Sequence, residues 1–200
     1  MIKKISEKIL NYLIIKKVIS DKKEDTDYYK YGIEITVSSL LNVLLIMLIG
    51  SVLGNFIESI IFLALFIPIR QFTGGFHANT YFKCNLIFCL SFIIAIIIYK
   101  LTNATLTSYV SILITFTSVL LMLFRCPIEH KNKPIPKKRR IFHKIMAVTL
   151  GSVYGIAGTA LVVLSNKYGA LIIYTLSLVT VLIIVALIIE WRCEYESSKK

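Results

Sequence analysis

The sequence predicts an all-α membrane protein with six transmembrane helices, an N-terminal amphipathic interfacial helix, and both termini in the cytoplasm. The 200 residues are 56% hydrophobic and have a mean hydropathy of +0.76, which soluble globular domains do not normally sustain over their whole length. Six apolar segments recur along the chain, and several approach the ~20 residues that a helix needs to cross the hydrocarbon of a bilayer. Lysine and arginine are concentrated in every second connection between the apolar segments, which is the pattern that sets the orientation of membrane proteins.

The whole chain, residues 1–200, is predicted to be one integral-membrane domain. It comprises an amphipathic N-terminal region (1–30), a transmembrane bundle (34–189) and a cytoplasmic tail (190–200). The net charge of +12 is segregated into the segments between apolar runs rather than laid along a nucleic-acid-reading fold. Anionic membrane lipids are therefore expected partners, and nucleic acid is not.

The first segment, Met1 to Ile19, has helical amphipathic spacing. Its apolar positions are Ile2, Ile5, Ile9, Leu10 and Leu13, and its lysines lie mostly elsewhere. This pattern is typical of a helix that lies on an anionic leaflet, and equally of a solvated helix packed on the rest of the protein.

Six apolar segments follow this helix. Their expected limits are Glu34–Gly54, Phe56–Ile69, Asn85–Tyr99, Ser108–Phe124, Ile145–Leu164 and Gly169–Ile189. The second and third are short, and they reach spanning length only if residues of the stretch Arg70 to Cys84 continue them, with Arg70 and Lys83 extending to the lipid headgroups.

Charge asymmetry predicts the orientation. With the N-terminus inside, 21 of the 23 lysines and arginines lie on the inner side and only Lys100 and Lys167 lie outside. This orientation places Arg70 to Cys84 at the cytoplasmic face of the cell membrane, in a reducing compartment. The four cysteines form no CxxC pair, so neither a disulfide framework nor a zinc site is indicated, and no metal or cofactor is expected.

The connection "RCPIEHKNKPIPKKRRIFHK", Arg125 to Lys144, contains three prolines, which disfavour a continuous helix there. It also contains four consecutive basic residues: Lys137, Lys138, Arg139 and Arg140. These residues are explained either as a patch that sets topology at the lipid headgroups or as a docking surface for an acidic partner segment.

The stretch "RQFTGGFHANTYFKC" interrupts the apolar pattern with candidate catalytic chemistry. His77 and Cys84 supply a base and a nucleophile, because imidazole can take the thiol proton and stabilise the thiolate. Arg70 would favour the thiolate further, and the amides of Gly74 and Gly75 are candidate donors to a developing oxyanion. One histidine and one cysteine are too few ligands for a metal site.

Spacing constrains this pair. On a straight helix, His77 and Cys84 would stand ~10.5 Å apart along the axis, with His77 leaning away from Cys84. A direct contact requires the backbone to bend or break between them. On the residues alone, packing residues near a membrane boundary are the alternative explanation.

The six apolar segments, the basic amphipathic start and the stretch "RQFTGGFHANTYFKC" together resemble the AgrB family, membrane endopeptidases of Gram-positive quorum sensing. The resemblance implies a thiol protease that removes the C-terminal part of an AgrD-like precursor peptide. It implies Cys84 as the nucleophile and His77 as the base, with Arg70 and Gly75 in support. A thiol or hydroxyl of the peptide would then displace Cys84 and close a thiolactone or lactone.

Several expectations remain open at this point. A third catalytic residue is not assigned; the candidates are Glu34, Gln71, Asn79, Asn85 and Glu129. Glu58 is expected near the outer side, and Cys89, Cys126 and Cys193 lack local activating groups. A peptide or small-solute transporter without proteolytic activity is the competing class, and a non-catalytic scaffold is a third. Membrane packing also allows a homodimer.

Overall fold

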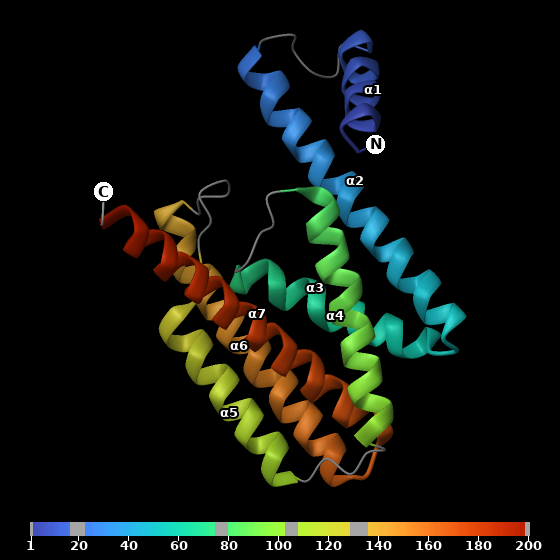
Figure 1. The fold of residues 1–200 in the computed structure, drawn as a ribbon, viewed down its shortest axis with the longest axis vertical. Coiled ribbons are helices and arrows are strands. Elements are labelled where there is room, and N and C mark those ends of the chain that lie inside the picture. The colour runs from blue at the N-terminus through green and yellow to red at the C-terminus, as the bar shows by residue number, and fades with distance from the viewer. Residues whose placement is uncertain (1, 17–22, 75–79, 103–107, 129–135, 199–200) are drawn as a thin grey trace.

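A computed structural model describes residues 2–16, 23–74, 80–102, 108–128 and 136–198. Within these ranges every regular element is a helix (Figure 1). The helices are α1 (Ile2–Ile15), α2 (Lys23–Val52), α3 (Phe56–Thr73), α4 (Tyr81–Thr102), α5 (Ser108–Arg125), α6 (Lys137–Val163) and α7 (Lys167–Ser198). The last six are each long and apolar enough to cross a membrane, so the all-α fold with six candidate spans is confirmed.

Three helices extend well beyond the apolar limits expected from the sequence. α2 begins at Lys23 rather than Glu34, α6 begins at Lys137 rather than Ile145, and α7 continues to Ser198 instead of giving way to a separate tail. Hydropathy marks the residues suited to hydrocarbon, whereas a helix satisfies its backbone hydrogen bonds internally and can continue into the polar region. The prolines before Lys137 are consistent with α6 starting no earlier than that residue, since Pro136 immediately precedes the helix.

The two short apolar segments reach spanning length as expected. α3 continues through Arg70 to Thr73, and α4 starts at Tyr81, three residues before Cys84. The stretch between Arg70 and Cys84 is therefore shared between the end of one span and the beginning of the next. If all six candidate helices cross the membrane, both ends of the chain lie on the same side, and the cytoplasmic placement of the termini stays a prediction.

α5, α6 and α7 run side by side as one layer of the bundle (Figure 1). Glycines of α6 allow the close approach: a Cβ at Gly155 would overlap the side chain of Thr115 in α5, and one at Gly158 would press on Ile173 in α7. Small residues at helix interfaces are the usual means by which membrane helices approach one another. α3 crosses this layer and contacts both α6 and α7, which brings its C-terminal end into the bundle.

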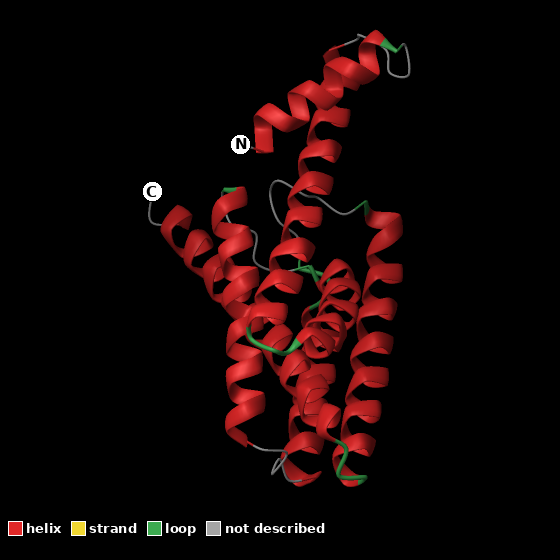
Figure 2. Cartoon of the chain, turned by 90° about the vertical axis from the view of Figure 1, so that its right-hand side faces the viewer, coloured by secondary structure: helices red, strands yellow, loops and turns green. Residues whose placement is uncertain are grey.

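α1 lies beside the N-terminal part of α2 (Figure 2). Their contact buries Ser6 and Leu10, and Lys30 forms an ion pair with Glu7 at 2.9 Å. The outward side of α1 keeps Tyr12 and Ile15 largely exposed. α1 is thus packed on the protein along one side, and the insertion of its exposed apolar residues into a leaflet remains a prediction.

Candidate functional site

The end of α3 is held against the residues that follow α5. Gly74, directly after α3, has φ 69° and ψ −140°, a conformation open to glycine almost alone. It forms an isolated parallel bridge with Ile128, whose N–H donates to the carbonyl of Thr73 at 3.0 Å. A Cβ at Gly74 would collide with the carbonyl oxygen of Ile128. The site therefore requires glycine at this position for a close backbone approach.

The sequence places Cys84 in the first turn of α4. Thr80 precedes the helix, and its hydroxyl accepts from the N–H of Lys83 at 3.3 Å, while its carbonyl accepts from the N–H of Cys84 at 3.1 Å. A threonine in this place is a standard N-cap. The N-terminal end of a helix carries partial positive charge, which favours a thiolate over a thiol. Cys84 itself is partly buried.

Arg70 occupies the last turn of α3 and differs from its expected placement. Its guanidinium donates from Nη1 to the carbonyl of Gly74 at 2.7 Å, rather than only extending toward lipid headgroups. Basic side chains commonly satisfy the free carbonyls at a helix C-terminus in this way. Its positive charge also interacts electrostatically with the thiols of Cys84 and Cys126. Arg70 thus links the helix end to the candidate nucleophile.

An aromatic cluster sets α3 and α4 in register. Phe66 and Phe88 meet edge to face with ring centroids 5.0 Å apart, and Phe62 meets Phe92 at 5.3 Å. Each four-residue step along α3 is matched by a four-residue step in the opposite direction along α4. The next step from Phe66 and Phe88 reaches Arg70 and Cys84, because residues four apart share a helix face. The spacing of the phenylalanines therefore places Arg70 and Cys84 one turn beyond the aromatic contact on their respective helices.

His77, Gly75, Asn79 and Glu129 lie outside the described residues. Thr80, which is described, is not helical, and the helix that carries Cys84 begins after it, at Tyr81. The contact between His77 and Cys84 stays a prediction. Gly74 serves the backbone approach described above, and the use of its amide as an oxyanion donor remains a prediction.

Two of the polar candidates for a third catalytic residue are instead paired between α2 and α4. The carboxylate of Glu34 accepts from the hydroxyl of Tyr81 at 2.7 Å, and Asn85 Oδ1 accepts from the hydroxyl of Ser38 at 2.9 Å. Gln71 is exposed. Sequence reasoning missed Tyr81 and Ser38, because no local pattern indicates that α2 and α4 lie side by side.

The remaining cysteines differ from Cys84 in environment. Cys126 is 6% exposed, and burial raises its pKa to about 12, although the charges of Arg70 and Lys144 act in the opposite direction. Cys89 packs against the apolar core, and the side chain of Cys193 lies outside the described part of the chain. Among the described residues no group of His, Cys, Asp and Glu is arranged to hold a metal.

Glu58 lies in the first turn of α3, at the opposite end of that helix from Arg70. Its charge interacts with Tyr99 and Lys167, which belong to the end of α4 and the start of α7. The start of α3, the end of α4 and the start of α7 lie at one end of the bundle, whereas Cys84 lies at the other end of α4. Glu58 therefore has no part in the candidate site.

The predicted docking residues fall in the first turn of α6. Lys138, Arg139 and Arg140 are exposed, and this turn contains no acidic residue; the side chain of Lys137 lies outside the described part. A helix N-terminus already attracts anions, and the basic side chains add to that attraction. The local chemistry suits a phosphate headgroup or a carboxylate.

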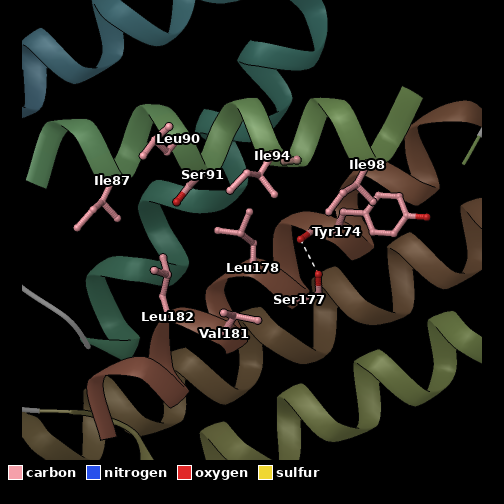
Figure 3. Close-up of a pocket in the computed structure, with 11 residues that line it drawn as sticks. Ile87, Leu90, Ser91, Ile94, Ile98, Tyr174, Ser177, Leu178, Val181 and Leu182 are labelled. Carbon is pink, nitrogen blue, oxygen red and sulfur yellow. Dashed lines mark hydrogen bonds between the residues drawn. The ribbon is translucent and has the colours of Figure 1, made fainter. Parts of the chain in front are cut away.

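An apolar groove lies between α4 and α7 and extends along α4 from Ile87 (Figure 3). Its volume is about 320 Å³, and it is lined by aliphatic residues such as Leu90, Ile94 and Leu178. The Ser177 hydroxyl at its edge donates to the carbonyl of Tyr174 at 2.8 Å, so it is already engaged. None of the described residues that line the groove is a cysteine, a histidine or a charged residue, and the groove therefore offers no catalytic chemistry.

Comparisons with known proteins extend over most of the chain. The family model of accessory gene regulator B (AgrB) matches residues 6–189. An AgrB-like protein of Clostridium perfringens is 24% identical over 139 residues, covering 66% of this chain and 65% of that protein. An AgrB-like protein of Listeria innocua is 25% identical over 150 residues, covering 73% and 72%.

A more distant similarity is to the protein FsrB of Enterococcus faecalis, which is 25% identical over 126 residues, covering 61% of this chain and 52% of that protein. The chain thus spans a little under two thirds of the length of the Clostridium perfringens relative and about half the length of FsrB. No solved structure matches. With a family match over residues 6–189, the chain belongs to the AgrB family, and its six apolar helices fit a multi-pass membrane protein.

Proposed function

We propose that this protein is a membrane-embedded cysteine endopeptidase that removes the C-terminal part of an AgrD-like precursor peptide. The observation that carries the proposal is the position of Cys84 in the first turn of α4, where burial disfavours the thiolate and the charge of Arg70 opposes that effect. A helix N-terminus and a nearby cation both favour a reactive thiolate. Membership of the AgrB family supports the same conclusion.

In this mechanism Cys84 attacks the scissile carbonyl, and His77 takes the thiol proton. The tetrahedral intermediate collapses when His77 gives that proton to the leaving amine, which yields an acyl-enzyme at Cys84. A thiol or hydroxyl within the retained peptide then attacks the thioester, releasing Cys84 and closing a thiolactone or lactone. A site at the edge of the bilayer restricts water, and proximity favours the internal nucleophile over hydrolysis.

Gly75 and Arg70 support this site in the proposal. The contacts of Arg70 favour a structural role combined with an electrostatic one, because the same guanidinium holds the carbonyl of Gly74 and acts on Cys84. The active site lies at the cytoplasmic face in this proposal, since that orientation puts 21 of the 23 lysines and arginines inside.

Mass spectrometry of a co-expressed precursor peptide tests the proteolytic step. Cleavage is expected to be lost in Cys84→Ala and in His77→Ala. Cys89→Ala is the matched control, because Cys89 lies on the same helix but packs against the apolar core, and it should retain cleavage. Undiminished cleavage by Cys84→Ala would remove the proposal.

The basic first turn of α6, comprising Lys137, Lys138, Arg139 and Arg140, is proposed to dock an acidic C-terminal segment of the precursor. Support comes from the exposure of Lys138, Arg139 and Arg140 and from the lack of an acidic residue in this turn. The same cations would contact anionic lipids when no peptide is bound.

Charge reversal at all four docking residues is expected to reduce processing of an acidic precursor at least tenfold. Lysines in place of the acidic residues of the precursor should restore it. This restoration separates docking from a change of membrane topology, since an inverted protein could not be rescued by a different peptide. Unchanged processing after the reversal would exclude the docking role.

A further inference from the structure

Two interhelical hydrogen bonds join α2 to the N-terminal part of α4. Tyr81 donates to Glu34 at 2.7 Å, and Ser38 donates to Asn85 at 2.9 Å. The two residues on each helix are four apart, so the bonds form successive rungs between two helices. Glu34, Ser38 and Asn85 are buried, with 8%, 6% and 7% exposure. The bond between Ser38 and Asn85 is buried and the bond between Tyr81 and Glu34 is partly buried, and hydrogen bonds shielded from water constrain helix position.

These rungs flank Cys84. Tyr81 is three residues before it and Asn85 follows it directly, so both lie within its own helical turn. At 100° per residue, Cys84 lies about 60° around the helix from Tyr81. Fixing Tyr81 and Asn85 against α2 therefore fixes the rotation of α4 at the turn that carries the Cys84 thiol.

α2 is well placed for this task because it contacts both α3 and α4 extensively. α3 and α4 approach each other much less closely through their backbones, and they meet through long aromatic side chains such as Phe66 and Phe88. The aromatic side chains fix the register of α3 and α4, but they do not reach the end of the interface that carries Arg70 and Cys84. At that end, α2 holds α4 through the two hydrogen bonds described above.

We propose that Glu34, through Tyr81, and Ser38, through Asn85, are positioning residues that hold the Cys84 thiol beside Arg70. The effect on catalysis rests on the proposed cysteine endopeptidase function. The positioning of the Cys84 thiol does not depend on any substrate. Glu34 touches neither the thiol nor the peptide in this role. It acts on the reaction only by holding the first turn of α4.

The hydrogen bond between Tyr81 and Glu34 predicts which substitutions at these two residues impair function and which does not. Tyr81→Phe leaves a buried carboxylate without this donor, which is costly. Glu34→Ala removes the rung entirely, whereas Glu34→Gln keeps an oxygen that can accept from the Tyr81 hydroxyl. Glu34→Gln is therefore the conservative variant expected to preserve function where Tyr81→Phe and Glu34→Ala do not.

Alkylation of Cys84 by iodoacetamide as a function of pH measures positioning without any substrate. The full-length protein in detergent would carry Cys89→Ala, Cys126→Ala and Cys193→Ala, so that only Cys84 reacts. Tyr81→Phe and Glu34→Ala are expected to move the pH midpoint of alkylation upward by about one unit, because the thiolate loses part of the field of Arg70. Glu34→Gln should leave the midpoint close to that of the parent.

Processing of the precursor measures the catalytic consequence in the wild-type cysteine background. Tyr81→Phe and Glu34→Ala should lower kcat about tenfold with little change in KM, since the docking surface is untouched. Ser38→Ala should have a smaller effect in the same direction. Its matched control is Ser118→Ala, which removes a hydrogen bond of 2.8 Å from Thr180 between α5 and α7, away from Cys84. That control should leave both kcat and the alkylation midpoint unchanged.

An alkylation profile that stays the same in Tyr81→Phe, or an equal shift in Ser118→Ala, would overturn the positioning role. If Cys84→Ala retained processing while Tyr81→Phe still shifted the alkylation midpoint, the endopeptidase proposal would fall and the positioning of Cys84 would stand. If Cys84→Ala lost processing while Tyr81→Phe left the midpoint unshifted, the endopeptidase proposal would stand and the positioning role would fall. The two proposals therefore fail in distinguishable ways.

Discussion

Phe66 of α3 and Phe88 of α4 pack edge to face, with ring centroids 5.0 Å apart, one helical turn from Arg70 and Cys84 respectively. This aromatic contact determines which residues of the two spans face each other at the polar end of the bundle. Because Phe66 is only 3% exposed, its ring is part of the core rather than of the lipid-facing surface. The position of the candidate nucleophile therefore depends on packing deep in the membrane.

Phe66→Ala is expected to destabilise the bundle by about 3 to 5 kcal/mol, as large-to-small changes at buried aromatic positions do. It should also reduce precursor processing, because Arg70 and Cys84 lose their register. Thermal unfolding in detergent checks the first effect and peptide mass spectrometry the second. Phe116→Ala is the control, since Phe116 on α5 is 64% exposed and should change neither quantity appreciably. Equal melting temperatures for the two variants would contradict the role of this contact.

Gly74→Ala is expected to disrupt the site for two reasons, a positive φ and the collision of its Cβ with Ile128. Gly54→Ala separates the two effects, because Gly54 has nearly the same φ, 68°, but open space where its Cβ would stand. Backbone strain alone costs about 1 to 3 kcal/mol. Gly74→Ala should therefore lower the unfolding temperature more than Gly54→Ala, and it alone should abolish processing. Equal effects would mean that the bridge to Ile128 is dispensable.

Arg70 is expected to act on Cys84 chiefly through its charge. In the variant that retains only Cys84, Arg70→Gln should slow alkylation near neutral pH about tenfold by removing the cation. Arg70→Lys should keep most of the reactivity, although it loses the planar donor group that holds the Gly74 carbonyl. An alkylation rate in Arg70→Gln equal to that of the parent would show that the thiol does not sense this charge.

The thiol of Cys126 is expected to stay protonated at pH values well above those at which a cysteine usually ionises. Burial raises its pKa from 9.0 to about 12, so the folded protein prefers the neutral thiol where an unfolded chain would ionise. Its contribution to stability is complete below about pH 9 and is lost as the pH rises toward 12. A variant with Cys126 as its sole cysteine should react with N-ethylmaleimide at pH 8 at least a hundredfold more slowly when folded than in SDS. Similar rates in the two states would contradict the burial of this thiol.

Much of the fold follows from local pattern. Hydropathy identified all six candidate spans, and it also indicated that α3 must include Arg70 and that α4 must begin before Asn85. It failed at the polar ends of α2, α6 and α7, because transfer to hydrocarbon is not the condition for a helix to continue. The basic turn at Lys138 was expected in a loop and belongs to a helix for that reason.

The candidate site was predictable in composition but not in its contacts. The residue types of "RQFTGGFHANTYFKC" were sufficient to propose a nucleophile, a base and a supporting cation, since those roles depend on chemistry that each side chain carries by itself. The partners of Glu34 and Asn85 were not predictable, because each pairs with a residue 47 positions away, Tyr81 and Ser38 respectively. No local pattern specifies which helix will be adjacent.

The sequence by itself therefore determined the helices, the number of spans and the segment that carries the thiol, because these depend on hydropathy and on residues near one another in the chain. Only the tertiary structure decided that Gly74 meets Ile128, that Arg70 turns to the Gly74 carbonyl, and that α2 anchors the first turn of α4. Such contacts arise from how whole helices pack, and packing depends on the shapes of all the faces together rather than on any one segment.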